Sequence, residues 1–569
     1  MLFSSKVKSP GPLIMPSNTW YLRLFLAILC SLPVMLAAYI HLKIGTALYI
    51  VIGTALISFS FLFLPFVFFK QKTAFLICTL FLLVSPLEII HLILHKESVG
   101  SGFILLLFQT NSQEIGELLM FHKFWTVVYL FTLALYLFIC IRYVENRYLL
   151  PRKYRYSMLL FLLLFLGALY AFSFKGTYDS KNTASENFKK AKAAFALKFR
   201  KIYPVNILTA SNKAYRFYRD ISCVNPEIEH FTFNAFKQDS IPYKEIYVSV
   251  IGEAARYANF SINGYRRETT PLLAKTDNII SFSDVYSLSN LTSVSLPLLL
   301  TRATPQDFSL SSKEKTLVDA FQEAGFSTYW IANQSAGSVF IRNMAQRCNR
   351  SYFAIKDFES VDNYDEFLWT FFDEVLSKDE KKQFIVMHTL GSHFRFNLRY
   401  PEEFKKFKPD LEGMTDYSLL NKNIKEQLIN SYDNSILYTD YFLANTIQKL
   451  KEPEAISFLF YIPDHAENLY DDNDYVLHAS NTPPPLEVHI PMIIWTSDKY
   501  REIYRSKHEA VLGNVDKSLT ADVVFYSLLD MANISIPDEK HGNSITNPAL
   551  KNDSVRYVLN PKKEIIIYK

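Results

Sequence analysis

An aspartate and a histidine stand side by side at the end of a strongly apolar run in the last quarter of the chain. The run covers residues 456–462 and is followed by Pro463, Asp464 and His465. A carboxylate oxygen and a neutral imidazole nitrogen are both good ligands for zinc. Open α/β sheets bind their ligands at the carboxyl ends of the strands, so a pair in this position lies where a metal site is expected. The sequence therefore predicts a metal site at the rim of a sheet.

Three other apolar runs also end in polar residues that could bind a metal or form hydrogen bonds. The runs at 245–251, 327–331 and 384–388 lead into Glu253, into Asn333 and into His393, and a fifth run covers 491–496. Apolar strands that alternate with mixed polar segments are typical of a largely parallel sheet covered by helices. We therefore expect an α/β domain from about residue 241 to 569, with its metal site at the strand ends and Asn333 placed to contact substrate.

A reaction at such a metal site would also need a nucleophile, and a hydroxyl group could supply it. Zinc held by Glu253, Asp464 and His465 would keep a vacant position, and a cation lowers the pKa of an oxygen ligand that fills it. Composition does not choose among the hydroxyls of the segment 285–304, which are Ser287, Ser289, Thr292, Ser293 and Ser295. Thr292 could open a helix whose first amides hold a phosphate. Helix capping without any chemistry is the alternative.

The first third of the chain contains five apolar stretches that could cross a membrane. Each is long enough at about 1.5 Å per residue to cross, or nearly cross, a bilayer core of roughly 30 Å. They cover residues 20–40, 45–69, 73–94, 124–141 and 156–174. We therefore expect a transmembrane domain over residues 1–174, with a loop at 96–123 that lies along the membrane interface. Glu88, near the far end of the third stretch, is expected to be solvated at that interface.

Lysine and arginine are concentrated in the N-terminal tail and in the loops around residues 70–72 and 142–155. These segments all fall on one side of the membrane, so the positive-inside rule places the N-terminus in the cytoplasm. Five crossings then place everything after residue 174 outside, which in a bacterium is the periplasm. The net charge of +5 comes with basic residues at membrane edges rather than in one stripe, so no nucleic-acid partner is expected.

Residues 175–240 are expected to connect the two domains. Basic and aromatic residues alternate there at a spacing that suits a helix lying on the membrane surface, although an ordinary helix packed on the globular domain would show the same pattern. Cys223 and Cys348 are the two cysteines outside the apolar spans. They could form a disulfide if the fold brings them together.

Four motifs resemble those of the bacterial phosphoethanolamine transferases, members of the alkaline phosphatase and sulfatase superfamily. They are VIGEAARYANFSINGYRRETTP (250–271), NLTSVSLP (290–297), VMHTLGSH (386–393) and DHAEN (464–468) followed by YVLH (475–478). The resemblance covers nearly the whole chain, including five helices before a periplasmic domain. It implies zinc bound by Glu253, Thr292, Asp464 and His465, with Thr292 as the nucleophile.

The resemblance also implies roles for residues outside this set. His393 and His478 match positions that bind a second, transient zinc or contact the substrate phosphate, and they are candidate proton carriers. His388 matches another histidine position of the family. Thr110 and Glu114 match positions of the membrane domain that bind the ethanolamine head group.

The chain departs from the family's pattern in a few places. Leu288 and Leu298 stand where the branch that modifies lipid A carries cysteines, so the disulfide that brackets the nucleophile there is absent. Leu106 stands where relatives often have Asn, and DHAEN replaces the commoner DHGES.

The expected function is transfer of phosphoethanolamine from phosphatidylethanolamine, through a phosphothreonine, to a cell-envelope acceptor. Lipopolysaccharide is the expected acceptor, through its core or lipid A, and periplasmic glucan is the alternative. A zinc-dependent hydrolase of phosphodiesters or sulfate esters, and a membrane scaffold without activity, are the other function classes. We expect a monomer in the bacterial inner membrane.

Overall fold

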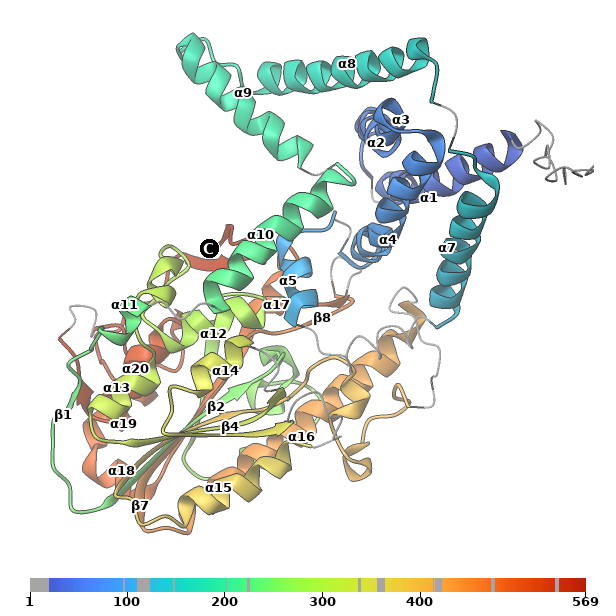
Figure 1. The fold of residues 1–569 in the computed structure, drawn as a ribbon. Coiled ribbons are helices and arrows are strands. Elements are labelled where there is room, and N and C mark those ends of the chain that lie inside the picture. Colours follow the sequence, from blue (N-terminus) through green and yellow to red (C-terminus); the bar gives the residue numbers. More distant parts are fainter. Residues whose placement is uncertain are drawn as a thin grey trace, which may run out of the picture. The chain divides into compact units, whose positions relative to one another are not determined.

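The computed structural model describes thirteen segments of the chain, and they form two compact units. The segments are residues 20–43, 45–95, 98–109, 123–146, 149–200, 202–222, 226–335, 339–355, 364–412, 414, 422–471, 476–537 and 542–569. One unit, the helical unit, comprises Met1–Ser98 and Phe124–Leu208. The other, the sheet unit, comprises Val99–Lys123 and Thr209–Lys569. Figure 1 shows the elements of each.

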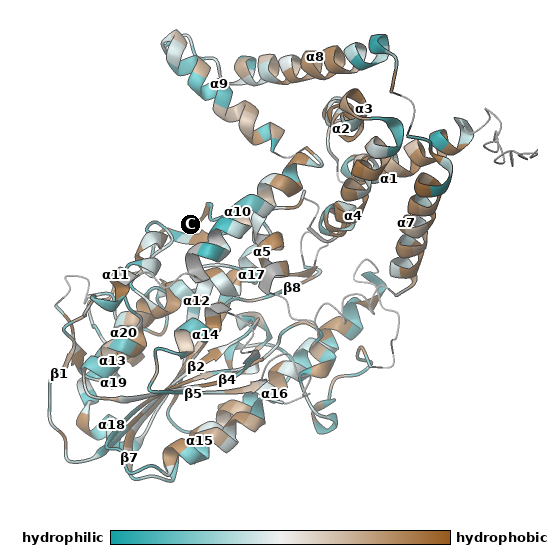
Figure 2. Ribbon diagram, in the orientation of Figure 1, coloured by the Kyte–Doolittle hydropathy of each residue, from teal (hydrophilic) through white to brown (hydrophobic). Residues whose placement is uncertain are grey.

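The helical unit contains the five predicted spans. Among the described residues, five helices are long and apolar enough to cross a membrane. They are α1 (Trp20–Lys43), α2 (Leu48–Phe63) continued by the short α3 (Pro65–Phe68), α4 (Gln71–His95), α7 (Lys123–Tyr143) and α8 (Arg152–Thr177). Figure 2 shows these helices coloured largely as hydrophobic residues, as expected for helices that lipid surrounds. The prediction of five apolar helices is confirmed.

Glu88 of α4 is buried rather than solvated. Its side chain is 2% exposed, and Oε2 accepts a hydrogen bond of 2.5 Å from Asn206 Nδ2. Asn206 belongs to α10 (Val205–Ser222), close to Tyr203, whose hydroxyl donates to Phe81 O of α4 at 2.5 Å. The expectation of a solvated carboxylate at a helix end is therefore wrong, because the segment after the last span returns to cover it.

The expected connecting segment contains two helices. α9 (Ala184–Phe199) begins with a capping box, in which Thr183 and Glu186 satisfy each other's backbone groups, and it packs against α8 through aromatic contacts such as Tyr170 with Phe195. α10 follows it. The helical character of the segment is confirmed, whereas its place on a membrane surface and the domain boundaries at residues 174 and 240 remain predictions.

The sheet unit is built on one sheet of eight strands. Their order is β11–β3–β10–β7–β2–β6–β4–β5, and only β10 runs antiparallel to its neighbours. The bounds are β2 (Lys244–Gly252), β3 (Ile279–Tyr286), β4 (Ser327–Ser335), β5 (Arg350–Ile355), β6 (Lys382–His388), β7 (Ala455–Pro463), β10 (His489–Thr496) and β11 (Ser518–Thr520). The five predicted strands and the largely parallel sheet are confirmed. β3, β5 and β11 were not predicted.

Helices cover both faces of this sheet (Figure 1). α15 (Leu368–Leu376) and the long α16 (Lys425–Lys451) lie on one face, and α12 (Thr292–Leu300), α13 (Leu317–Glu323) and α20 (Val523–Met531) lie on the other. The central strands β2 and β7 are therefore buried on both sides, which explains their nearly continuous apolar sequences.

The register of the central strands brings their carboxyl ends to one level. Ile251 of β2 pairs with Ile462 of β7 on one side and with His388 of β6 on the other. Each strand then leads directly into the polar residues that follow it. Residues that lie more than two hundred positions apart in the sequence thus meet at one edge of the sheet.

Candidate metal centre

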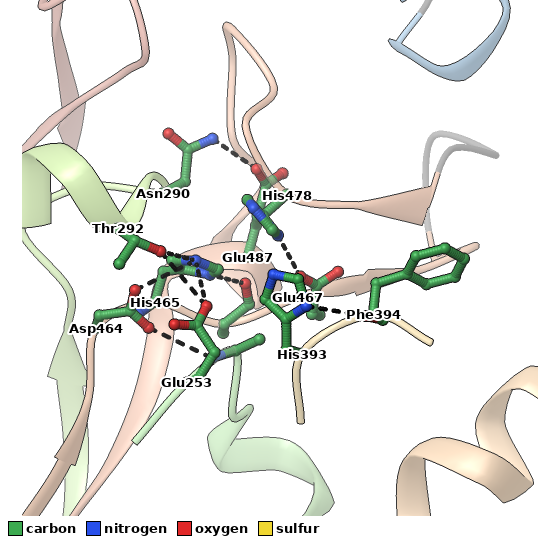
Figure 3. Close-up of polar contacts among 12 residues, drawn as sticks. Glu253, Asn290, Thr292, His393, Phe394, Asp464, His465, Glu467, His478 and Glu487 are labelled. Carbon is green, nitrogen blue, oxygen red and sulfur yellow. Dashed lines mark hydrogen bonds and ion pairs between the residues drawn. The ribbon is translucent and has the colours of Figure 1, made fainter. Parts of the chain in front are cut away.

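Three buried side chains and one hydroxyl converge at this edge (Figure 3). Ligand atoms of Glu253, Asp464 and His465 lie within 4.8 Å of one another. His465 Nε2 is 3.3 Å from Glu253 Oε1 and 3.4 Å from Asp464 Oδ2. Thr292 Oγ1 is 3.3 Å from His465 Nε2 and 3.4 Å from Glu253 Oε1. The four residues predicted as ligands therefore face one point.

Each of the two residues at the end of β7 is oriented by backbone groups. His465 Nδ1 lies 2.8 Å from the carbonyl oxygen of Ala466, which can only accept, so Nδ1 carries a proton and Nε2 is the ring nitrogen that faces the cluster. Asp464 Oδ1 accepts from the amides of Ala254 and His465 at 3.3 and 2.8 Å. Its buried Oδ2 has no hydrogen-bond partner among the described residues. Such an oxygen is costly to bury unless a cation binds it.

The electrostatics of the cluster favour positive charge. Burial, with the nearby Asp464 carboxylate, raises the pKa of Glu253 to about 7. Burial alone would lower the pKa of His465, but the carboxylates of Asp464 and Glu253 outweigh it and raise that pKa to about 10. Two carboxylates, an imidazole nitrogen and a hydroxyl form a donor set that suits zinc. The residues present therefore fit the metal that the motif resemblance implies.

Thr292 is the hydroxyl that reaches the cluster, because α12 begins at this residue. The four serines considered with it are buried; Ser287 Oγ donates to Ser289 O at 2.9 Å, and Ser295 Oγ donates to Asp464 O at 2.5 Å. As the first residue of a helix of nine residues, Thr292 also lies at the positive end of the helix dipole. The structure thus separates Thr292 from its neighbours where composition did not.

A tight loop after β6 packs against the backbone of Glu253. The amide of Ser392 donates to Glu253 O at 3.0 Å, and Gly391 has a φ of +49°. A Cβ atom on Gly391 would lie 2.9 Å from Glu253 O and 3.0 Å from Glu253 N. Only glycine fits this close approach without moving Glu253.

The comparisons with known proteins agree with this architecture. Residues 245–534 match the family described as sulfatase, a stretch that covers just over half of the chain. The chain belongs to the sulfatase family. The match begins in β2 and ends in the short strand β12 (Ile534–Ser535), so it includes every residue of the cluster.

Among curated sulfatase-family relatives, the chain is similar to phosphoethanolamine transferases, as its motifs indicated. It is 30% identical to phosphoethanolamine transferase EptC of Escherichia coli K12 over 340 residues, which cover 58% of each chain. It is 32% identical to Kdo(2)-lipid A phosphoethanolamine 7''-transferase of Salmonella typhimurium over 286 residues, 49% of this chain and 48% of that one. The matches thus span about half to three-fifths of the length of these relatives.

Two solved structures support the fold at different levels. The C-terminal periplasmic domain of Escherichia coli EptC, solved in complex with Zn, is 28% identical with a TM-score of 0.52, and the match covers 58% of this chain and 94% of that one. The integral membrane protein EptA of Neisseria meningitidis matches with a TM-score of 0.69 over 94% of this chain and 99% of that one, at 23% identity. The second match shows the fold alone, and it includes the apolar helices. The predicted fold class is confirmed.

A second group of ligand atoms in this sulfatase-family site includes a residue that the sequence did not single out. Atoms of His465, Glu467 and His478 lie within 4.8 Å of one another, and Glu467 Oε1 contacts His478 Nδ1. Burial raises the pKa of Glu467 to about 8. The sequence could have indicated Glu467 as a possible ligand, because it stands three residues after Asp464 within the DHAEN motif. Glu467 thus joins the two predicted positions, His465 and His478.

His393 and His478 lie beside the cluster as neutral imidazoles (Figure 3). Burial, followed by the positive charge of Arg399, lowers the pKa of His393 to about 3. Burial also lowers the pKa of His478 well below its ordinary value. His393 Nδ1 lies 2.9 Å from Phe394 O and therefore carries the proton. Their remaining ring nitrogens are available to a substrate or a second metal, and these roles stay predictions.

Asn333 is hydrogen-bonded to Asp365, which in turn holds the loop after β6. Its Nδ2 donates at 2.9 Å to Oδ1 of Asp365, whose two oxygens also accept from the amides of Leu390 and Gly391. The adjacent Gln334 reaches the cluster instead, since its Nε2 is 3.1 Å from Thr389 O and 3.5 Å from Glu253 Oε2. The alternation of side chains along β4 explains why neighbours differ. A substrate contact of Asn333 remains a prediction.

His388 is fully buried at the end of β6. Its ring packs edge-on against Trp330 with centroids 5.9 Å apart, and neither ring nitrogen has a hydrogen-bond partner among the described residues. Burial lowers its pKa to about 3. These contacts fit a neutral histidine of the core, and its substrate role stays a prediction.

The other predicted positions are placed only in part. Thr110 and Glu114 lie outside the described residues, as does Cys223. Cys348 is buried. Leu288 and Leu298, the positions of cysteines in relatives, are buried apolar residues.

A buried carboxylate links the segment just before Thr292 to the loop that carries His478. Glu487 Oε1 accepts a 2.5 Å hydrogen bond from Asn290 Nδ2, and its Oε2 accepts a 2.8 Å bond from Ser480 Oγ. Asn290 Nδ2 also donates to Ser480 O at 2.9 Å. Burial raises the pKa of Glu487 to about 7. No local pattern in the sequence distinguished Glu487, because its partners come from distant segments.

Proposed function

We propose that this protein is a phosphoethanolamine transferase that uses Thr292 as its nucleophile. The observation that carries the proposal is the position of Thr292 Oγ1, at the start of a helix and within 3.4 Å of both Glu253 and His465. The similarity to named phosphoethanolamine transferases supports the substrate class. The donor would be phosphatidylethanolamine, a membrane lipid, and the apolar helices of the same chain support a membrane location.

Glu253, Thr292, Asp464 and His465 would hold a zinc ion. When bound, zinc supplies positive charge that lowers the pKa of the threonine hydroxyl and balances charge on the phosphoryl oxygens. The Oδ2 of Asp464, which has no hydrogen-bond partner among the described residues, and the raised pKa of Glu253 support a cation at this point. A second zinc near His393, Glu467 and His478 would be weaker, since it would share the ligand environment of His465.

The chemistry would take two in-line displacements. In the first, Thr292 Oγ1 attacks the phosphorus of phosphatidylethanolamine, the bond from phosphorus to the glycerol oxygen breaks, and diacylglycerol leaves. In the second, an acceptor oxygen attacks the phosphothreonine and releases Thr292. His393 and His478 are neutral, so each can accept the proton that the acceptor loses. A phosphoryl group on Thr292 would lie at the N-terminal end of α12, where the helix dipole would favour its negative charge.

The acceptor would be a component of the cell envelope. One relative's name specifies Kdo(2)-lipid A, which supports lipopolysaccharide, through its core or lipid A, over periplasmic glucan. The distribution of lysine and arginine supports an inner-membrane protein with a cytoplasmic N-terminus and a periplasmic sheet unit. We propose that Thr110 and Glu114 contact the ethanolamine head group, with Asn333 and His388 near the substrate, and that the protein works as a monomer.

The full-length protein in vesicles that contain ethanolamine-labelled phosphatidylethanolamine provides the test. With lipopolysaccharide and glucan supplied, mass spectrometry should find labelled phosphoethanolamine on one of them, and Thr292→Ala should remove it. Release of free phosphoethanolamine alone would identify a hydrolase instead. Unchanged envelope modification with Thr292→Ala would leave a scaffold without this activity.

A further inference from the structure

The chain ends in a two-stranded hairpin that lies beside the catalytic loops. β13 (Arg556–Leu559) and β14 (Ile565–Tyr568) pair antiparallel, with Tyr557 opposite Ile567 and Leu559 opposite Ile565. The amide of Leu559 donates to Leu288 O at 2.9 Å, and Leu559 forms an isolated bridge with Ser289. These contacts lie four and three residues before Thr292. The hairpin is thus attached to the nucleophile segment.

The inner face of the hairpin is packed and its other edge is attached to a second catalytic loop. Val558 is fully buried with Tyr286 and Val488. The hydroxyl of Tyr568 donates to Pro483 O at 2.5 Å, in the loop that follows His478. A hairpin held at both strands cannot move far without moving these loops.

The turn of the hairpin contacts the start of α5 (Ser101–Gln109) within the sheet unit. A Cβ atom on Gly100 would lie 2.8 Å from Lys562 Cε, so the two residues are in contact. Gly100 follows His95, the last residue of the candidate span α4, by five residues. The hairpin turn thus contacts a segment that begins a few residues after α4 in the sequence.

The outer face of the hairpin is apolar and exposed. Ile565 is 43% exposed and Ile567 is 57% exposed. Lys569 shares their side of the strand by the alternation of side chains, and the exposed Lys563 lies in the turn. Lys213 of α10 reaches the same turn through a 2.7 Å bond to Lys562 O. Glu564 is the one exposed acidic residue of this turn, and Lys563 Nζ stands 4.2 Å from the centroid of the Phe308 ring. Exposed isoleucines with more lysines than carboxylates beside them match a surface with apolar depth and anionic head groups.

We propose that this outer face, formed by Ile565, Ile567 and Lys569 with Lys563 of the turn, rests on the surface of a bilayer that contains anionic phospholipid. The isoleucines enter the boundary between head groups and acyl chains, and the lysines remain at the level of the phosphates. The contact sets the height of the catalytic loops above the bilayer. It is a physical contact with lipid and does not depend on the reaction that Thr292 performs.

Photocrosslinking in the full-length protein tests the contact. The crosslinking residue p-benzoylphenylalanine replaces Ile565 in one variant and Tyr243 in another, and the protein is placed in vesicles of phosphatidylethanolamine and phosphatidylglycerol. Tyr243 is also 43% exposed but precedes β2, at the end of the sheet opposite to Glu253. The two sites thus match in exposure and differ in position. Lipid adducts are identified by mass spectrometry of the crosslinked peptides.

We expect lipid adducts at position 565 in several-fold excess over position 243. The excess should fall when phosphatidylglycerol is replaced by phosphatidylcholine, and when Ile567→Asp places a charge on the same face. Equal lipid labelling at both positions would overturn the proposal, as would an adduct at 565 with a second copy of the chain. Because crosslinking does not require turnover, loss of the proposed transferase activity would not affect this result.

Discussion

Replacing Gly391 by alanine should weaken zinc binding although Gly391 supplies no ligand. Two costs follow from the structure. The first is conformational: at φ +49° an alanine costs about 1–2 kcal/mol. The second is steric, since the new Cβ would lie 2.9 Å from Glu253 O, and ordinary contact begins at 3.4 Å. The backbone of Glu253 or the loop must therefore yield by about 0.5 Å, more than the roughly 0.2 Å that metal–ligand distances tolerate.

A displacement of this size should misplace the Glu253 carboxylate about as much as losing a residue that orients a metal ligand. We therefore expect zinc affinity to fall by about 10- to 100-fold. The measurement is a competition titration of the full-length protein against a chromophoric zinc chelator, together with thermal unfolding. Gly264→Ala is the matched control, because Gly264 has a φ of +94° and a Cβ added there would meet no atom within 4 Å. It should lose a similar amount of stability, about 1–2 kcal/mol, and keep its zinc affinity.

The result that would refute this reasoning is a Gly391→Ala protein that binds zinc as tightly as Gly264→Ala. Glu253 would then not be a ligand, or the loop after β6 would not press on it. Equal loss of affinity in both variants would instead attribute the effect to general destabilisation.

Four other outcomes are expected. Thr292→Ala should lower head-group transfer by at least about 10³-fold while zinc stays bound, and Thr292→Ser should restore part of the rate, as measured with labelled phosphatidylethanolamine. Glu487→Gln should lower the free energy of unfolding by about 1–3 kcal/mol in chemical denaturation, whereas the exposed Glu509→Gln should change it by less than about 0.5 kcal/mol. Arg267→Ala removes the charged partner of a buried aspartate on α16 and should cost about 1.5–3 kcal/mol, against less than about 1 kcal/mol for Lys406→Ala, whose ion pair is exposed. Dialysis against EDTA should abolish transfer, and added zinc should restore it; activity that survives chelation would contradict the metal assignment.

Properties that depend on local sequence could be predicted before the structure was known. Five apolar stretches of sufficient length indicated five helices, since burial in lipid requires a continuous run of apolar residues. Apolar runs that end in Glu253, His393 and Asp464 indicated strands that lead into a polar rim. The prediction succeeded because a strand that is buried on both faces has a nearly continuous run of apolar residues.

Contacts between distant segments were decided only by the tertiary structure. The sequence singled out Asn333, and the structure adds its neighbour Gln334, whose Nε2 lies 3.5 Å from Glu253 Oε2, while Asn333 bonds to Asp365. Nothing in the local sequence distinguished Glu487, because its role depends on hydrogen bonds with Asn290 and Ser480, which belong to other segments.

The amino-acid sequence by itself determined which elements form and which residue types stand at their ends, because propensity and burial act over a few neighbouring residues. Only the tertiary structure decided that β2, β7 and α12 meet at one point, that Gly391 must lack a side chain and that Glu88 is covered. Each of these depends on packing between parts of the chain that are close in space and remote in sequence.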